Sequence, residues 1–185
     1  MSYTVLGGEQ VEQFLDQGYV KIDSCFEKAD IQDWIDLAFR RLGYQPDDAT
    51  TWTETKVHLP SINHVDVADF APKAWGAICD LMGGVDRIKT PVQWRDGFIM
   101  NFNLGAGQPW QPPSPKVGGW HKDGDWFRHY LDSPEQGLLT VVLWDDIRPR
   151  SGGTFLATDS IAPIAWYLAE HPQGLAPTEA QFGKL

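Results

Sequence analysis

The sequence has 185 residues, of which 42% are hydrophobic and 22% are charged, with a net charge of −10. These values exclude a disordered or fibrous chain, and no apolar run approaches the about 18 residues that a membrane span requires. The acidic balance argues against nucleic acid and anionic membranes as partners, because both require basic patches on the protein.

The cysteine content narrows the class of protein further. Only Cys25 and Cys79 are present, which excludes a disulfide framework and a cysteine-rich zinc site. The first residues lack the basic and then apolar segments of a secretory signal. We therefore expect a cytoplasmic protein. Its length predicts a single domain over residues 1–185, since about 150 residues is a common domain size.

Residues 1–89 are predicted to be mainly helical. Apolar side chains recur there with helical spacing. The expected helices surround Val11–Leu15, span Ile31–Leu42 and cover residues 71–82. Glycines follow these helices at positions 18, 43 and 83, as expected of residues that end helices. Tyr19–Ile22 alternates like a short strand.

Residues 90–185 are predicted to be rich in β-structure. Val92–Leu104 is aromatic and β-prone, and Asp96-Gly97 interrupts it, which indicates a hairpin or a bulge. The strongest strand signal is Leu138–Ile147, and shorter strands are expected over Trp120–Asp123 and Thr154–Ala157, followed by a helix after Ser160. Helices followed by about five or six strands favour an α+β fold with an antiparallel sheet.

The segment Gly119-Trp120-His121-Lys122-Asp123-Gly124 is the most informative for chemistry. On a strand, His121 and Asp123 would point to the same face and could offer a nitrogen and an oxygen to one ion. A second histidine would complete the two-histidine, one-carboxylate face that leaves positions open on Fe(II). The alternative is a hydrogen-bonded loop pair. His64-Val65-Asp66 has the same spacing, and there we expect surface-loop or helix-capping chemistry.

Four segments occur in an order that resembles the phytanoyl-CoA dioxygenase-like family of Fe(II)/2-oxoglutarate oxygenases. These segments are Asp96–Phe102, Gly119–Phe127, Thr140–Trp144, and Ser151–Thr154 with the helix that follows. The opening helix, Gly18-Tyr19-Val20 and the helix from about residue 28 are similar to that family as well. The resemblance covers roughly residues 8–175 and is most specific over residues 119–157.

This resemblance implies a double-stranded β-helix, also called a jelly-roll or cupin-like fold, with N-terminal helices packed on it. It implies Fe(II) as the metal, 2-oxoglutarate and O₂ as co-substrates, and hydroxylation of a small organic substrate. His121 and Asp123 match the first two iron ligands. Trp144 matches a position that packs against 2-oxoglutarate, and Asn101 or Asn103 would reach the same co-substrate.

Two parts of the family's site have no clear counterpart. The family uses a late second histidine and an arginine that pairs with the distal carboxylate of 2-oxoglutarate. After Asp123 only His129 and His171 remain, and no arginine follows Arg150. His129 is expected at a pocket rim and His171 at the end of a helix. The jelly roll is therefore expected to be incomplete, in either a fragment or a shortened relative, with an open sheet edge that favours self-association.

Three functions remain open at this point. The first is an Fe(II)/2-oxoglutarate dioxygenase, inactive if the shortened chain lacks the parts above. The second is a non-catalytic remnant of such an enzyme. The third is a jelly-roll module that binds sugars or other small molecules through exposed tryptophan faces. In each case the expected partner is a small molecule, and neither nucleic acid nor a membrane.

Overall fold

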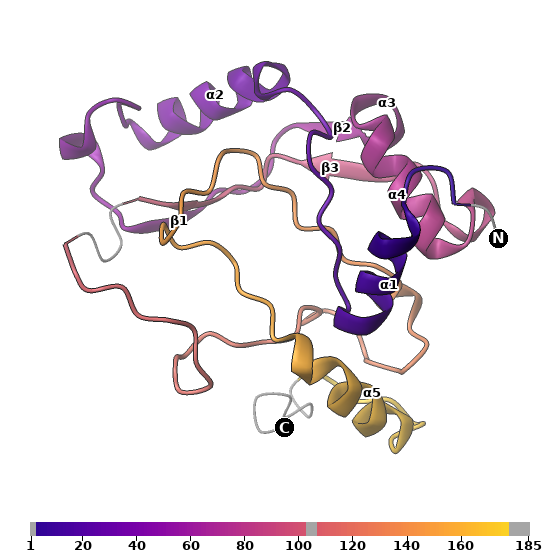
Figure 1. The fold of residues 1–185 in the computed structure, drawn as a ribbon. Coiled ribbons are helices and arrows are strands. Elements are labelled where there is room, and N and C mark those ends of the chain that lie inside the picture. The colour runs from indigo at the N-terminus through magenta and orange to yellow at the C-terminus, as the bar shows by residue number, and fades with distance from the viewer. Residues whose placement is uncertain (1–2, 103–106, 178–185) are drawn as a thin grey trace. The chain divides into compact units, whose positions relative to one another are not determined.

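The computed structural model describes residues 3–102 and 107–177, and these form two compact units (Figure 1). The first unit comprises Met1–Val5, Ile22–Trp110 and Val142–Gly153. The second comprises Leu6–Lys21, Gln111–Val141 and Thr154–Leu185. Helices and antiparallel strands are both present, so the predicted α+β class is confirmed.

The first unit contains the helices α2 (Gln32–Leu42), α3 (Val67–Phe70) and α4 (Pro72–Met82). Short 3-10 turns lie at Lys28–Ile31, Ala49–Thr51 and Val85–Arg87. The apolar spacing predicted α2 and α4 to within one residue at their C-terminal ends, where Gly43 and Gly83 follow. Asp66 caps α3, because its carboxylate accepts a hydrogen bond of 2.9 Å from the Ala68 N–H.

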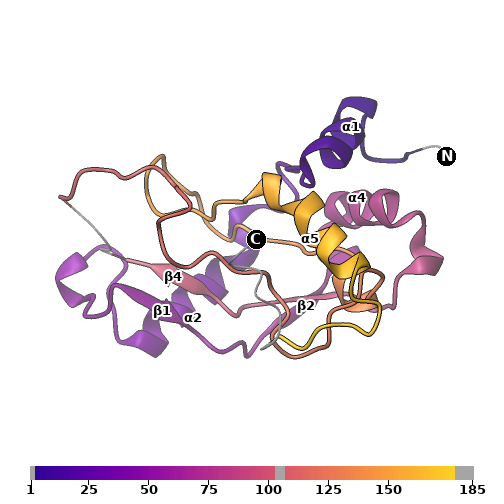
Figure 2. The same ribbon diagram turned by 90° about the horizontal axis from the view of Figure 1, so that it is seen from below.

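An antiparallel ribbon with a break in its middle forms the rest of the first unit. β1 (Lys56–His58) pairs with β4 (Ile99–Asn101), and β2 (His64–Asp66) pairs with β3 (Gln93–Arg95). Figure 2 shows β1 and β4 at one end of this ribbon and β2 at the other. The sequence signal at Asp96-Gly97 is therefore a break between two ladders, and the alternative of a hairpin between β3 and β4 is wrong.

Asp96 holds the ribbon together at this break. Its carboxylate accepts hydrogen bonds from the Ile62 and Asn63 main-chain N–H groups and from the Asn63 side-chain amide, at 2.7–2.8 Å. The side chain is 2% exposed. Burial raises the pKa of this carboxyl, but the three hydrogen bonds outweigh it and hold the pKa below its ordinary value.

Aromatic side chains fill the core of the first unit. Trp94 and Phe98 lie two residues before and after Asp96, and all three are buried on one side of the chain. The half-buried Trp144 joins this group, with ring centroids 5.3–6.3 Å from those of Phe26, Trp34, Phe70, Trp94 and Phe98. The neighbouring Asp145 forms an ion pair with Lys28.

The second unit contains α1 (Gly8–Gln17) and α5 (Ile161–Ala169), with short 3-10 turns at Pro134–Gln136 and Thr158–Ser160. Both helices are where the sequence predicted them, and α1 ends at Gly18, which has a φ of 73°. A hypothetical Cβ on Gly18 would lie 1.8 Å from the Ile161 Cδ1 atom. Glycine at position 18 therefore allows the end of α1 to approach the start of α5 closely.

The predicted β-rich core of residues 90–185 is not what the described residues form. Their four strands lie between Lys56 and Asn101, in two two-stranded antiparallel sheets, and they make no jelly roll. The segments predicted as strands at 19–22, 120–123, 138–147 and 154–157 are irregular.

The physical reason is the lack of pairing. A strand persists only where a neighbour accepts and donates its ladder hydrogen bonds, and no described strand pairs with Leu138–Ile147. The side chains of this segment still differ in exposure. Leu139, Val141 and Leu143 are exposed, whereas Val142 and Trp144 are half-buried.

None of the helices in residues 3–102 and 107–177 is both long and apolar enough to cross a membrane.

The role of Asp96 leads to a stability prediction. Asp96→Ala should lower the free energy of unfolding by about 2–4 kcal/mol, because the main-chain N–H groups of Ile62 and Asn63 and the Asn63 amide all lose their acceptor. Urea unfolding followed by tryptophan fluorescence measures this loss. The matched control is Asp47→Ala, since Asp47 is exposed.

The pH dependence has a definite sign. The folded pKa of Asp96 lies below the ordinary value of about 3.9. Its stabilisation is therefore complete above that value and is lost as the pH falls through the folded pKa. The difference in stability between the original chain and Asp96→Ala should shrink on acidification, and a constant difference would contradict this role.

Trp144 gives a second stability prediction. Trp144→Ala should cost about 3–5 kcal/mol because it leaves a cavity among the surrounding aromatic rings. Trp166→Ala removes a side chain that is 72% exposed and should change stability by less than about 0.5 kcal/mol. Equal effects of the two substitutions in urea unfolding would show that Trp144 is not part of the core.

Candidate functional site

The segment around His121 is a loop in the second unit and not the expected strand. The Trp120 indole N–H donates to the Ser114 carbonyl at 2.9 Å, which fixes the start of the loop. Gly124 has a φ of 112°, and a Cβ there would lie 2.5–2.7 Å from atoms of Phe127 and His129. Glycine is thus required at this turn.

His121 and Asp123 are brought together in this loop. The His121 Nε2 atom lies 3.1 Å from the Asp123 Oδ1 atom, and the two side chains are 73% and 53% exposed. The other ring nitrogen, Nδ1, lies 2.8 Å from the Gly119 carbonyl oxygen. The predicted proximity therefore arises from loop geometry, since the segment does not alternate as a strand.

These contacts define which nitrogen faces the carboxylate. A carbonyl oxygen only accepts, so the Nδ1 atom carries the hydrogen that it donates to Gly119. In a neutral ring the Nε2 atom then presents a lone pair to a carboxylate oxygen. Two acceptors at 3.1 Å repel unless a cation lies between them, and that cation is either a proton or a metal ion.

The separation also suits two ligands of one metal ion. Adjacent ligands of an octahedral ion with bonds of about 2.1 Å lie about 3.0 Å apart, close to the 3.1 Å between the two atoms here. Donation of the Nδ1 hydrogen to a main-chain carbonyl orients a ligating imidazole in the same way in metal sites generally.

The candidate third ligands are placed elsewhere. His129 is 2% exposed, and its Nδ1 atom is 2.8 Å from the Lys122 ammonium, which donates to it. A metal ion at this nitrogen would have to displace a cation. The His171 Nδ1 atom lies 2.7 Å from the Tyr167 carbonyl oxygen, just after α5. Within the described residues, no three His, Cys, Asp or Glu side chains form a group that could hold a metal ion.

An Fe(II) centre with two histidines and one carboxylate is therefore not assembled by this part of the chain. His121 and Asp123 fit two adjacent ligand positions, and the third remains without a candidate among residues 3–102 and 107–177.

The predicted co-substrate residues belong to the first unit. Trp144 packs among aromatic rings there, and the Asn101 amide donates to the Gly152 carbonyl at 3.4 Å. Asn103 lies outside the described residues. A contact of Trp144 or Asn101 with 2-oxoglutarate stays a prediction.

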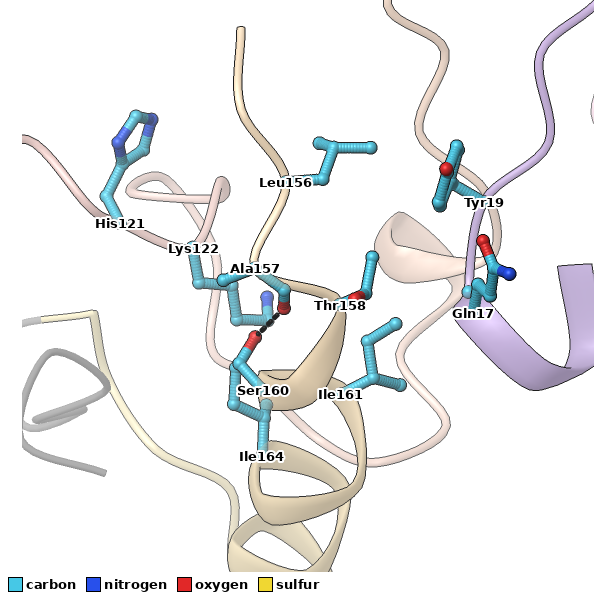
Figure 3. A pocket seen from close by; sticks show the side chains of 11 residues that line it. Gln17, Tyr19, His121, Lys122, Leu156, Ala157, Thr158, Ser160, Ile161 and Ile164 are labelled. Atoms are coloured by element: carbon cyan, nitrogen blue, oxygen red, sulfur yellow. Dashed lines mark hydrogen bonds between the residues drawn. The ribbon is translucent and has the colours of Figure 1, made fainter. Parts of the chain in front are cut away.

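A cavity of about 210 Å³ adjoins the His121 loop, with every lining residue in the second unit (Figure 3). Its lining comprises Gln17, Gly18, Tyr19, His121, Lys122, Leu156, Ala157, Thr158, Ser160, Ile161 and Ile164. Sequence reasoning missed all of these except His121. Lys122 was missed because strand alternation would point it away from its neighbours, whereas the loop does not alternate.

Lys122 has a distinct environment at this cavity. Its ammonium donates to the His129 Nδ1 atom at 2.8 Å and to the Asp123 carbonyl at 3.2 Å, and it lies 5.6 Å from the centroid of the Phe127 ring. Burial lowers the pKa of Lys122, and the nearby Asp123 carboxylate partly opposes that shift.

Comparisons of the chain with protein-family models, with curated proteins and with solved structures give no match.

The geometry of the loop predicts a metal-binding pair. His121→Ala and Asp123→Ala should each reduce Mn(II) affinity by at least about tenfold, because each substitution removes one of the two protein ligands. Titration of the chain with Mn(II), followed by electron paramagnetic resonance of the free ion, measures the affinity.

His64→Ala is the matched control for this experiment. His64 and Asp66 have the same spacing, but the Asp66 carboxylate already accepts from the Ala68 N–H in capping α3. Loss of Mn(II) binding in His64→Ala, with retention in His121→Ala, would show that the metal binds at His64 and that the assignment to His121 and Asp123 is wrong.

Proposed function

We propose that the chain binds a divalent metal ion through His121 Nε2 and the Asp123 carboxylate. The observation that carries this proposal is the 3.1 Å separation of two exposed acceptor atoms, with the imidazole oriented by its bond to Gly119. Their exposure leaves room for further ligands from solvent or a small molecule.

The wider proposal is an Fe(II)/2-oxoglutarate oxygenase of the phytanoyl-CoA dioxygenase-like kind, acting on a small organic substrate. The order of the segments over residues 96–157 supports it, and so does the paired histidine and aspartate. In such enzymes Fe(II), 2-oxoglutarate and O₂ supply the oxidising power for C–H hydroxylation. This chain would contribute the two ligands and their orientation.

The jelly-roll fold and a cytoplasmic location belong to the same proposal. The alternating apolar residues of Leu138–Ile147 support a strand that pairs only when a neighbour is supplied. Such an unpaired edge would also favour self-association. Cys25 and Cys79 are both free thiols, as expected in a reducing compartment.

A second candidate is binding without turnover. It is favoured by the lack of a third ligand beside His121 and Asp123 among residues 3–102 and 107–177, and by exposed indoles, of which Trp126 is 75% exposed. Aromatic faces of this kind bind sugars and other ring compounds. Quenching of tryptophan fluorescence by oligosaccharides, lost in Trp126→Ala, would support this candidate.

The ligand set predicts the outcome of a turnover assay. Residues 1–185 with Fe(II), ascorbate and 2-oxoglutarate should produce no succinate above a control containing metal alone, because the described part of the chain brings together only two of the three protein ligands that the iron site needs. Quantification of succinate by chromatography measures this.

Robust succinate production would contradict that expectation. If it were then lost in His129→Ala or His171→Ala, the variant would identify the third ligand and show that the site is complete. His58→Ala serves as the control, since His58 lies on β1 in the first unit.

A further inference from the structure

The cavity beside His121 has a mixed lining. Its large apolar side chains are Leu156, Ile161 and Ile164, its basic side chains are Lys122 and His121, and neutral polar side chains come from Gln17, Tyr19, Thr158 and Ser160. Figure 3 shows the Lys122 side chain extending toward the Ala157–Ser160 turn, and the His121 ring pointing away from the isoleucines. A lining of apolar side chains with a small number of polar groups is the usual form of a small-molecule site.

The cavity is partly open to solvent, so its volume limits only the part of an occupant that it encloses. An apolar cavity of about 150 Å³ holds benzene, so the 210 Å³ here accommodates a body of that size together with one small polar group. A long-chain acyl thioester would extend far beyond it.

Charge indicates the nature of the polar group. Among the described residues that line the cavity, Lys122 and His121 are the basic ones, and none is acidic. This lining contrasts with the chain as a whole, which has 25 acidic and 15 basic residues. Asp123 is outside the lining, and its Oδ1 atom lies 3.1 Å from the His121 Nε2 atom.

The lining disfavours a second charge. A dicarboxylate such as 2-oxoglutarate, held by Lys122 at one end, would place its other carboxylate among Leu156, Ile161 and Ile164 and the neutral side chains of the lining. Neutral donors compensate the lost hydration of a carboxylate less than a cation does.

We propose that this cavity binds a compact monocarboxylate with an apolar body about the size of a benzene ring, its carboxylate at Lys122 and its body against Ile161 and Ile164. That this ligand is the substrate rests on the proposed function, whereas its binding does not require a metal. The cavity and the metal pair meet at His121, so an occupant would lie beside the ion.

Methyl NMR spectroscopy in the presence of EDTA tests the proposal on the whole chain. The chain is labelled at isoleucine Cδ1, and Ile161→Val and Ile164→Val assign the two signals. Benzoate is the probe, benzyl alcohol is its neutral analogue, and 2-oxoglutarate is the dicarboxylate. Benzoate should shift both signals and bind at least about fivefold more tightly than either of the other two compounds.

Substitution of the cation provides the second measurement. Lys122→Met should weaken benzoate binding about fivefold or more and leave benzyl alcohol unaffected, whereas Lys122→Arg should retain most of the preference. Lys116→Met is the control, since Lys116 is exposed and outside the cavity. The comparison of the three probes on the original chain remains decisive if Lys122→Met disturbs its contact with His129.

Three results would overturn the proposal. These are equal binding of benzoate and benzyl alcohol, tighter binding of 2-oxoglutarate, and no shift of the Ile161 and Ile164 signals by benzoate. Because the titrations contain EDTA, they are independent of the metal pair. If the chain binds benzoate but not Mn(II), the proposed function alone is refuted. If it binds Mn(II) but not benzoate, this inference alone is refuted.

Discussion

The buried carboxylate of Asp96 determines the arrangement of the first unit. Pro60, Ser61 and Ile62 leave the ladder between β1 and β2, so the main-chain N–H groups of Ile62 and Asn63 need another acceptor. Asp96 supplies it, and the ribbon continues on both sides. Trp94, Asp96 and Phe98 consequently stay on one buried face, although the chain changes pairing partners between them.

Because Trp94 and Phe98 share one buried face, both can pack against Trp144. Trp94 and Phe98 meet the Trp144 ring at nearly perpendicular angles, with centroids 6.1 and 6.2 Å apart from it. Edge-to-face pairs of this kind stabilise beyond simple area burial. The chain near Trp144 is held in the first unit by these rings and by the Lys28–Asp145 ion pair, without any ladder hydrogen bonds from a described strand.

Local signals in the sequence predicted the helices well, because each depends on residues a few positions apart. The apolar spacing from Ile31 to Leu42 and the glycines at 18, 43 and 83 define α1, α2 and α4 almost completely. Strand pairing depends on residues far apart in the chain, and there prediction failed. Alternation indicates that Leu138–Ile147 can form a strand, but it does not provide the partner that a strand requires.

In the candidate site, too, the local spacing of residues was informative and the surrounding structure was not predicted. Spacing predicted that His121 and Asp123 would share a face, and they are adjacent, although a glycine-bounded loop and not a strand places them so. Their role as metal ligands stays a prediction. The contact between Lys122 and His129, seven residues apart, has no periodicity that sequence reasoning could use.

The close approach of Gly18 to Ile161 has an evolutionary consequence. The missing Cβ at position 18 and the branched side chain at position 161 occupy one shared volume, although 143 positions separate them in the chain. A larger residue at position 18 requires the Ile161 side chain to move or to become smaller, and it must also adopt the positive φ of Gly18. Because Ile161 also lines the cavity, such a change would reshape the space open to a ligand.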